Sequence, residues 1–383
     1  MSKKNHSSLE EDIATYVNSI FKKSTDKVAY FLDGSDFNPS DITDWVSSGN
    51  DMLDIAISNR KNGGFPVGRI TEISGMEASG KSLLVCHAIK STQQKGGIAV
   101  YIDTENAASE EFMRAIGVDV SKMIYLSMYT VEDIFDTIEK MIIEVRKKDP
   151  NILLTIVIDS IMGATTKSEK EIGFDKQGWN TSKSIIISQA MRKITNYIGR
   201  NKVCLLITNQ LRVRLGALGG DIYTTSGGKG IPFHSSVRIR LEAGKKIFIE
   251  KNGKKDHVIG VQNVAHIKKN RLGPANRSIN YKIYYNSGMD NYGSWLEEMS
   301  NKKIVDLNGA WYTYRVVDKE TGEVIEEIKF QSKQFYDKII ANPKYKEMVY
   351  NQLCDELIFK YSINDAIDTD SIIIEEESDD DEY

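Results

Sequence analysis

The sequence is poor in cysteine and contains no long hydrophobic run. Its three cysteines, Cys86, Cys204 and Cys354, lie far apart, each within an apolar stretch. An odd number of widely spaced cysteines argues against disulfides and zinc ligation and indicates buried thiols in a reducing compartment. No stretch approaches the roughly 18 uninterrupted apolar residues of a membrane span, and the polar start of the chain is unlike a secretion signal. We therefore expect a cytoplasmic protein without a membrane anchor.

Basic residues are missing altogether from one segment. Residues 365–383 hold 10 Asp or Glu and no Lys or Arg, so the formal charge of −4 divides into −10 for this segment and +6 for the rest. Residues 229–282 are the opposite, with 13 Lys or Arg against 3 Asp or Glu. The basic segment suggests a polyanionic partner, and the acidic one is typical of a disordered tail. A solvated face and a solubility tail would explain the same pattern.

Residues 75–82 read Gly-Met-Glu-Ala-Ser-Gly-Lys-Ser, a complete G-x-x-x-x-G-K-S phosphate-binding loop. A β-branched run at 69–74 precedes it, and a helical pattern follows at 82–93. Glycines let consecutive backbone N–H groups point at a phosphate, and the helix N-terminus adds its positive dipole end. Lys81 would reach the β- and γ-phosphates, and the Ser82 hydroxyl would hold Mg²⁺. A glycine-rich turn with a chance lysine is the simpler alternative, but strand, loop and helix together predict a nucleoside triphosphate site.

Strand-like and helix-like segments alternate beyond this loop, which predicts an α/β fold with a mostly parallel sheet and helices on both faces. Strands are expected at 97–103, 123–126, 151–159 and 202–209, and helices at 109–116, 131–147 and 184–199. Segments 237–242, 246–250 and 257–261 look antiparallel, with a turn at 251–254 between the last two.

The pattern divides the chain into four regions. Residues 1–45 contain a helical stretch at 10–22 and a linker at 33–39, and residues 46–289 hold the alternating core. We expect a small α+β domain at 290–362, with an aromatic turn at 309–314, and a disordered acidic tail at 363–383.

Acidic and amide side chains follow the expected strands. Asp159 ends one strand, where an acid would hold Mg²⁺ through water. Asp103 and Glu105 follow another, where a carboxylate can deprotonate the attacking water, and Glu105 is the better placed. Glu105 could instead be an acid favoured by a helix N-terminus. Gln210 follows a third strand and could contact the γ-phosphate.

Several motifs resemble those of RecA-type recombinases, in particular the kind that bacteriophages carry, over about residues 49–314. The most specific are Thr208-Asn-Gln-Leu-Arg212 and Thr224-Thr-Ser-Gly-Gly228, supported by Lys268-Lys-Asn-Arg271 and Gly309-Ala-Trp-Tyr312. The resemblance implies a RecA-type ATPase core with an N-terminal polymerisation arm and a small C-terminal domain. It implies a DNA-dependent ATPase that uses ATP and Mg²⁺, forms helical filaments on single-stranded DNA, binds duplex DNA and exchanges strands. Loader and single-strand-binding proteins are the implied partners.

The resemblance also implies roles for individual residues. Lys81 and Glu105 would be catalytic, Gln210 would report the γ-phosphate to the DNA loops, and Lys269 and Arg271 would reach the phosphates of a neighbouring subunit. Segments 163–183 and 211–228 would be the two DNA loops. The expected nucleotide contacts are Gly75, Glu77, Ala78, Ser79, Gly80, Lys81, Ser82, Leu83, Phe112 and Asp159, with Ser82 and Asp159 at the metal. The expected DNA contacts are Trp179, Lys183, Arg212, Arg214, Leu215, Gly227 and Gly228.

The chain departs from the family pattern at a few positions. Phe112 stands where a tyrosine usually covers adenine, Leu83 replaces a hydroxyl after the phosphate loop, and Pro232 replaces a basic interface residue. The hairpin at 243–256 carries extra lysines and would either bind duplex DNA or be solvated. Trp179 and Leu215 match positions that wedge between base triplets, although Trp179 could instead be a core aromatic. An alternative function is a RecA-fold regulatory or mediator ATPase without strand exchange. A hexameric helicase fits less well because of the Thr-Thr-Ser-Gly-Gly loop.

Overall fold

The computed structural model describes residues 9–21, 28–31, 41–171, 179–213, 223–251, 254–318 and 321–361. The chain divides into two compact units, Met1–Thr43 and Asp44–Tyr383. The smaller unit contains α1 (Leu9–Ile20), which confirms the predicted helix. The side chain of Asn18 accepts hydrogen bonds from the backbone N–H groups of Val28 and Ala29 and thereby ties the helix to the segment after it. The predicted linker at 33–39 and the acidic tail lie outside the described residues.

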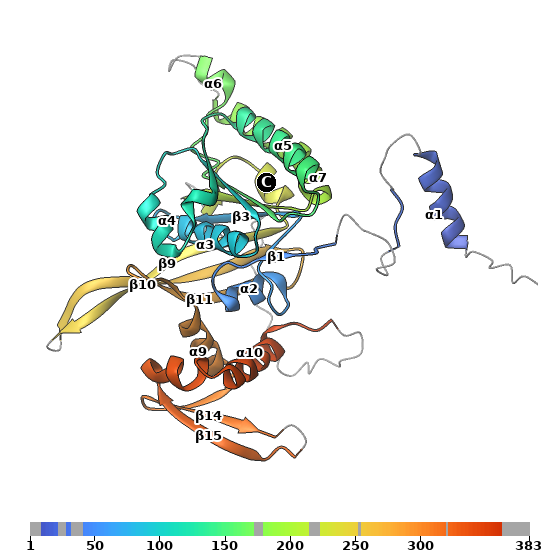
Figure 1. Cartoon of the computed structure of the whole chain (residues 1–383). Coiled ribbons are helices and arrows are strands. Elements are labelled where there is room, and N and C mark those ends of the chain that lie inside the picture. Colours follow the sequence, from blue (N-terminus) through green and yellow to red (C-terminus); the bar gives the residue numbers. More distant parts are fainter. Residues whose placement is uncertain are drawn as a thin grey trace, which may run out of the picture. The chain divides into compact units, whose positions relative to one another are not determined.

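A ten-stranded sheet forms the centre of the larger unit (Figure 1). Six neighbouring strands, in the order β9-β3-β7-β6-β4-β5, run parallel, and β10, β11 and β12 extend the sheet antiparallel beyond β9. This arrangement confirms the predicted α/β class. The strands are β3 (Arg69–Gly75), β4 (Ile98–Asp103), β5 (Met123–Ser127), β6 (Leu154–Asp159), β7 (Val203–Val213), β8 (Tyr223–Thr225), β9 (Val237–Lys251), β10 (Lys254–Asn270), β11 (Arg277–Tyr284) and β12 (Gly288–Asp290).

Helices cover both faces of the sheet. Side chains alternate along each buried strand, so every strand supplies apolar side chains to both faces. In β4, Ala99 and Tyr101 belong to the hydrophobic cluster under α3, whereas Val100 and Ile102 belong to the cluster under α5 and α7. The helices are α2 (Asp51–Ser58), α3 (Lys81–Gln94), α4 (Glu110–Ile116), α5 (Val131–Lys148), α6 (Lys167–Glu171), α7 (Trp179–Arg200) and α8 (Gly230–His234). A short separate sheet pairs β1 (Trp45–Val46) with β2 (Phe65–Pro66).

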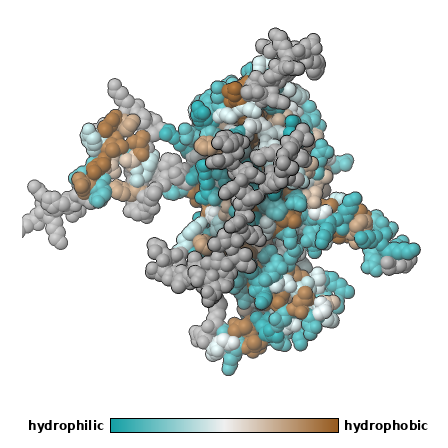
Figure 2. Space-filling model, turned by 180° about the vertical axis from the view of Figure 1, so that it is seen from behind, coloured by the Kyte–Doolittle hydropathy of each residue, from teal (hydrophilic) through white to brown (hydrophobic). Residues whose placement is uncertain are grey.

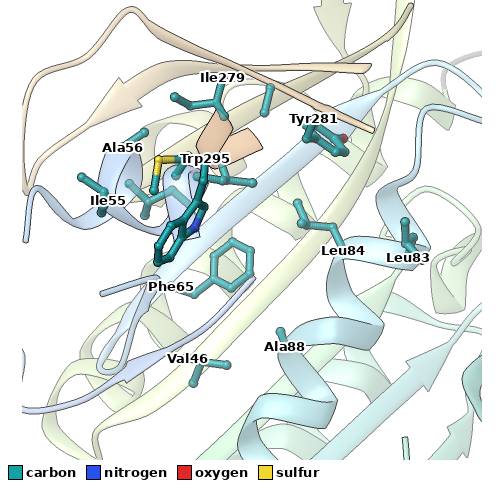
Figure 3. Packing of buried hydrophobic residues seen from close by; sticks show 14 of the residues in the cluster. Val46, Ile55, Ala56, Phe65, Leu83, Leu84, Ala88, Ile279, Tyr281 and Trp295 are labelled. Carbon is teal, nitrogen blue, oxygen red and sulfur yellow. The ribbon is translucent and has the colours of Figure 1, made fainter. Parts of the chain in front are cut away.

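The C-terminal segment packs on the same core. It comprises α9 (Asn291–Asn301), β13 (Val305–Asn308), β14 (Trp311–Val317), β15 (Val324–Gln331), a π-helical turn (Tyr336–Ile340) and α10 (Pro343–Leu357). Trp295 of α9 lies among residues of α2 and β2 in one continuous cluster (Figure 3), and its Nε1 donates a hydrogen bond to Asp51 Oδ2 at 3.0 Å. The predicted domain boundary at 289/290 therefore stays a prediction.

Four predictions about individual elements were wrong. The strand expected to end at residue 209 continues to Val213, because Leu211–Val213 pair with β8. Helix α7 begins at Trp179 rather than at 184, so part of the predicted loop 163–183 is helical. The strands expected at 237–242 and 246–250 are one strand, β9, paired along β10. The aromatic turn expected at 309–314 is mostly strand β14, in which Tyr314 is fully buried.

Candidate functional site

The phosphate-binding loop connects β3 to α3 at the carboxyl edge of the sheet. Gly80 precedes the helix with a φ of 90°, in the left-handed region that glycine tolerates. A Cβ on Gly75 would lie 2.2 Å from Ser79 Oγ, so the fold of the loop also requires glycine there. Lys81 Nζ donates hydrogen bonds to the carbonyls of Gly75 (3.0 Å) and Met76 (2.8 Å). The loop thus curls around the lysine ammonium group.

The loop has the features of a polyphosphate site. Ser79 Oγ is buried and has no hydrogen-bond partner among the described residues, and the first N–H groups of α3 are open to an anion. Burial lowers the pKa of Lys81, while the nearby carboxylates of Asp159, Glu105 and Glu77 act in the opposite direction. Lys81, Asp159 and Glu105 are therefore close enough for their charges to interact.

The oxygen donors near the loop fit a magnesium ion that is held jointly by the protein and by the phosphates of a nucleotide. Ser82 is exposed at the start of α3. Asp159 accepts hydrogen bonds of 2.5 Å from Tyr101 OH and Thr208 Oγ1. No group of three His, Cys, Asp or Glu residues suited to a metal occurs in the described part of the chain. Magnesium commonly uses one or two protein ligands together with waters and substrate phosphates, so a serine hydroxyl and one carboxylate would be an ordinary donor set for it.

Leu83 and Phe112 differ in their exposure. The Leu83 side chain is 5% exposed and packs in the hydrophobic core (Figure 3). Only its backbone could therefore contact a phosphate. Phe112 lies on α4 and is 41% exposed, so its ring is open for a planar base to stack on.

Glu105 and Asp103, the two candidate bases, have different surroundings. Asp103 is 1% exposed and accepts three hydrogen bonds, from the backbone N–H groups of Glu105 (2.9 Å) and Ala108 (3.0 Å) and from Tyr125 OH (3.1 Å). Glu105 is exposed, and its carboxylate accepts a hydrogen bond from Ser160 Oγ at 2.5 Å. Asp103 thus shapes the turn that presents Glu105, which leaves Glu105 as the carboxylate available to water.

Gln210 lies beside the phosphate loop because its Cα pairs with that of Gly75 across β3 and β7. Its carbonyl accepts a hydrogen bond from Ser226 N at 3.4 Å. Two residues further along the same strand, Arg212 is exposed and pairs with Thr224 of β8. One continuous strand therefore connects the loop to the second predicted DNA segment.

Residues of the two predicted DNA loops lie near each other. Burial lowers the pKa of Lys183, and the positive charge of Arg212 lowers it further, against the effect of Glu169. Gly227 and Gly228 have φ values of 94° and 77°, and a Cβ on Gly228 would lie 3.0 Å from Ser184 Cβ of α7. Trp179 opens α7. Arg214 and Leu215 lie outside the described residues.

Lys269 and Arg271 are at the far end of β10 from the phosphate loop. Asn263 of β10 reaches the loop, because its Nδ2 donates to Ser79 O at 3.0 Å. Lys269 follows six residues later, about 20 Å along an extended strand. Its Nζ donates to the carbonyls of Pro232 (2.8 Å) and Phe233 (3.0 Å). The structure thus brings these two basic residues together at the Phe233 carbonyl, and their side chains donate there and not to the phosphate loop of their own chain.

Strands β9 and β10 leave the sheet as a projecting two-stranded hairpin (Figure 1). Its lysines are Lys245, Lys246, Lys251, Lys254 and Lys255, and within the described part of the chain none has a carboxylate at ion-pair distance. Phe248 and Ile249 are 36% and 41% exposed beside them. Seen from behind, the hairpin surface is largely hydrophilic with hydrophobic spots (Figure 2).

Comparison with known proteins decides the family. The sequence pattern of the RecA N-terminal domain matches residues 16–290. The chain belongs to the RecA family. Relatives named Protein RecA include one from Desulforapulum autotrophicum, 32% identical over 80% of this chain and 81% of the relative. One from Geobacter metallireducens is 34% identical over 77% and 83%, and one from Borreliella afzelii is 32% identical over 81% and 82%.

Membership of the RecA family confirms the predicted recombinase function and the predicted DNA-dependent ATPase activity. The alternative of a regulatory ATPase without strand exchange is not favoured. As a RecA-family protein the chain binds nucleotide and DNA and forms filaments. These relatives are bacterial, and the expected closeness to phage recombinases stays a prediction. Among the described residues, no helix is both long and apolar enough to cross a membrane.

Sequence reasoning missed the side chains that hold the site residues in place. Ser160 contacts Glu105, and Tyr101 and Thr208 contact Asp159. Glu72 and Asn209 form a buried pair behind the loop. The available signals were Glu72, an acid inside a strand rich in β-branched residues, and Ser160, a hydroxyl directly after Asp159.

Proposed function

We propose that this protein is an ATP- and Mg²⁺-dependent strand-exchange protein that acts in the cytoplasm, where loader and single-strand-binding proteins assist its assembly on single-stranded DNA. The observation that carries the proposal is the course of β7. Gln210 pairs with Gly75 of the phosphate loop, and the same strand leads to exposed Arg212. Nucleotide and DNA would therefore act on two ends of one rigid element.

The residues around the loop divide the chemistry of hydrolysis among them. Lys81 and the N–H groups of α3 would bind the phosphate chain, and Ser82 and Asp159 would hold Mg²⁺, which neutralises phosphate charge when bound. Glu105 would take the proton of the attacking water. Ser160 would orient Glu105 through their hydrogen bond. Phe112 would stack on the adenine ring.

Lys269 and Arg271 would complete the site of a neighbouring subunit. Their side chains donate to the carbonyls of Pro232 and Phe233 and not to groups of their own phosphate loop, which makes them candidates for the loop of a neighbour. Two cations placed against the γ-phosphate from outside would act as a trans arginine finger does, by stabilising charge in the transition state. Filament assembly, with residues 1–45 as the polymerisation arm, would then be required for full activity.

The DNA contacts would be mostly to phosphates and base faces. Lys183, Arg212 and Arg214 would neutralise phosphates, and Gly227 and Gly228 would let backbone N–H groups approach the strand. Trp179 and Leu215 would separate or stack on bases. Because base pairing supplies sequence recognition, the protein should show little sequence preference.

A strand-exchange assay tests the proposal. A filament formed on a single strand with ATP and Mg²⁺ should displace the labelled identical strand from a homologous duplex and leave a heterologous duplex intact. A protein that hydrolyses ATP on single-stranded DNA but never displaces the homologous strand would instead support the mediator alternative.

A further inference from the structure

Two hydroxyl groups hold the carboxylate of Asp159 from the strands on either side of it. Asp159 ends β6, whose neighbours in the sheet are β4 and β7. Tyr101 of β4 donates to Oδ2 and Thr208 of β7 donates to Oδ1, each at 2.5 Å. All three side chains lie on the face that α3 covers, because the residues two positions earlier in each strand belong to the hydrophobic cluster there. The carboxylate is thus held between two strands.

These hydrogen bonds leave the carboxylate one orientation. Hydrogen bonds from O–H groups to an ionised oxygen are short, about 2.5–2.7 Å, and roughly twice as strong as neutral ones. An ionised carboxylate has about four acceptor sites, so about two stay available after Tyr101 and Thr208 have donated. Because β4 and β7 both pair with β6 along its length, the spacing of the two donors is fixed. Asp159 therefore presents its remaining acceptor sites in a set direction.

Tyr101 is itself held firmly. Its side chain is 3% exposed and belongs to the hydrophobic cluster under α3. Burial, and after it the negative charge of Asp159, raises the pKa of the Tyr101 hydroxyl, so the group keeps its proton and donates. A buried hydroxyl needs a hydrogen-bond partner, and the Asp159 carboxylate is that partner. The hydroxyl and the carboxylate therefore fix each other.

Tyr125 of β5, the cross-strand neighbour of Tyr101, holds a different acid. The two tyrosines pair in the sheet, and their rings stack with centroids 6.4 Å apart and an interplanar angle of 10°. The Tyr125 hydroxyl, however, donates to Asp103 Oδ2 at 3.1 Å, and its side chain is 45% exposed. Two adjacent tyrosines thus serve separate acids: one the acid assigned to the metal, the other the acid that shapes the turn before Glu105.

A carboxylate fixed from both sides suits a metal ion with strict geometry. Mg²⁺ demands near-ideal octahedral coordination at about 2.0–2.1 Å, whereas Ca²⁺ accepts flexible coordination at about 2.3–2.6 Å. Hydrogen-bond partners behind a metal ligand set its orientation, and their loss weakens metal binding although they do not touch the ion. The two hydroxyls beside Asp159 have this arrangement.

We propose that Tyr101 is a positioning residue that fixes the Asp159 carboxylate for Mg²⁺ and thereby favours Mg²⁺ over larger ions. The inference rests on the proposed function, because it concerns the ion that Asp159 would hold there. Thr208 shares this task from the other side. Tyr101 acts through Asp159 and is not itself a ligand of the ion or of the nucleotide.

The test measures the affinity of the full chain, without DNA, for a fluorescent non-hydrolysable ATP analogue. Each protein is titrated in excess Mg²⁺, in excess Ca²⁺ and in EDTA. In Tyr101→Phe the affinity in Mg²⁺ should fall by about 10- to 100-fold, the usual effect of losing a hydrogen bond behind a metal ligand. The affinity in Ca²⁺ should fall less. The affinity in EDTA should keep its wild-type value, because the phosphate loop itself is unchanged.

Two further variants separate metal positioning from general packing. Tyr125→Phe removes the same hydroxyl from the adjacent ring and should keep the wild-type affinity in all three conditions. Thr208→Val removes the other donor and should repeat the pattern of Tyr101→Phe, which also covers a Tyr101 variant that does not fold.

Three results would overturn the inference. They are wild-type affinity in Mg²⁺ for both Tyr101→Phe and Thr208→Val, a loss as large in Ca²⁺ or in EDTA as in Mg²⁺, and an equal loss in Tyr125→Phe. A wild type that binds the analogue equally well in Mg²⁺ and in EDTA would instead overturn the part of the proposed function that assigns Mg²⁺ to this site.

Discussion

Lys269 and Arg271 should complete the ATP site of a neighbouring subunit, and a mixing experiment can show it. The double variant Lys269→Ala, Arg271→Ala keeps its own phosphate loop intact. Since both side chains donate to the Pro232 and Phe233 carbonyls and not to groups of that loop, nucleotide binding by a single subunit should be unchanged. The rise in ATP turnover that accompanies assembly on DNA should fall by about 10³-fold or more, the contribution of a trans arginine.

The second protein in the mixture is Lys81→Ala, which lacks a working loop but retains the basic pair. Filament contacts are head-to-tail, so in a random equal mixture about one interface in four joins an intact loop to an intact pair. Because Lys81→Ala protein is not expected to assemble on DNA by itself, it enters filaments only beside the double variant. Turnover should therefore recover to at most about a quarter of the wild-type rate, although each protein alone is inactive. The assay is steady-state phosphate release with saturating single-stranded DNA.

A mixture no more active than its components would refute the trans assignment. In that case the pair would belong to the DNA surface, and the double variant would lose DNA affinity instead. Its salt dependence would then become shallower by about one unit per phosphate contact removed. Measurement of the salt slope alongside turnover therefore distinguishes the two roles.

Three other changes test separate parts of the site. Glu105→Gln should keep ATP binding but slow turnover by about 10²-fold or more, the scale of a lost general base; a normal rate would transfer the role elsewhere. Deletion of residues 375–383 should strengthen duplex binding at low salt, and this gain should shrink above about 0.15 M as charges are screened; equal binding at low salt would contradict tail competition. Lys254→Glu places a carboxylate opposite Lys251, so it should stabilise the hairpin by about 0.2–1 kcal/mol in unfolding measurements yet weaken duplex binding; unchanged binding would show that the hairpin is only solvated.

The parts of the fold that could be predicted are those whose signal is local. The strand before Asp159 is a nearly continuous apolar run because both faces of the sheet are covered. The phosphate-loop motif fixes its own strand–helix context. The chain order of Glu105, Asp159 and Gln210 then places all three at one edge of a parallel sheet, because the carboxyl ends of parallel strands meet there.

What could not be predicted depends on contacts between distant segments. Strand β7 extends past Asn209 only because β8 pairs with its last three residues. The sequence of residues 211–213 does not itself indicate that a second strand pairs with them. The sequence favoured Glu105 over Asp103 by position alone, and the physical reason, the three hydrogen bonds that occupy Asp103, comes only from the structure. The hydrogen-bond partners of Glu72 lie 137 and 166 residues away in the chain. The sequence around Glu72 therefore does not indicate that its carboxylate is the centre of a buried polar cluster.

The central claim is that nucleotide at the phosphate loop controls assembly on DNA, and electron microscopy tests it most directly. The wild-type protein, single-stranded DNA and a non-hydrolysable ATP analogue should give regular helical filaments. Omission of the analogue, or use of Lys81→Ala protein with it, should leave the DNA without them. Closed rings in place of filaments, or filaments that form equally well without the analogue or with Lys81→Ala, would contradict the account.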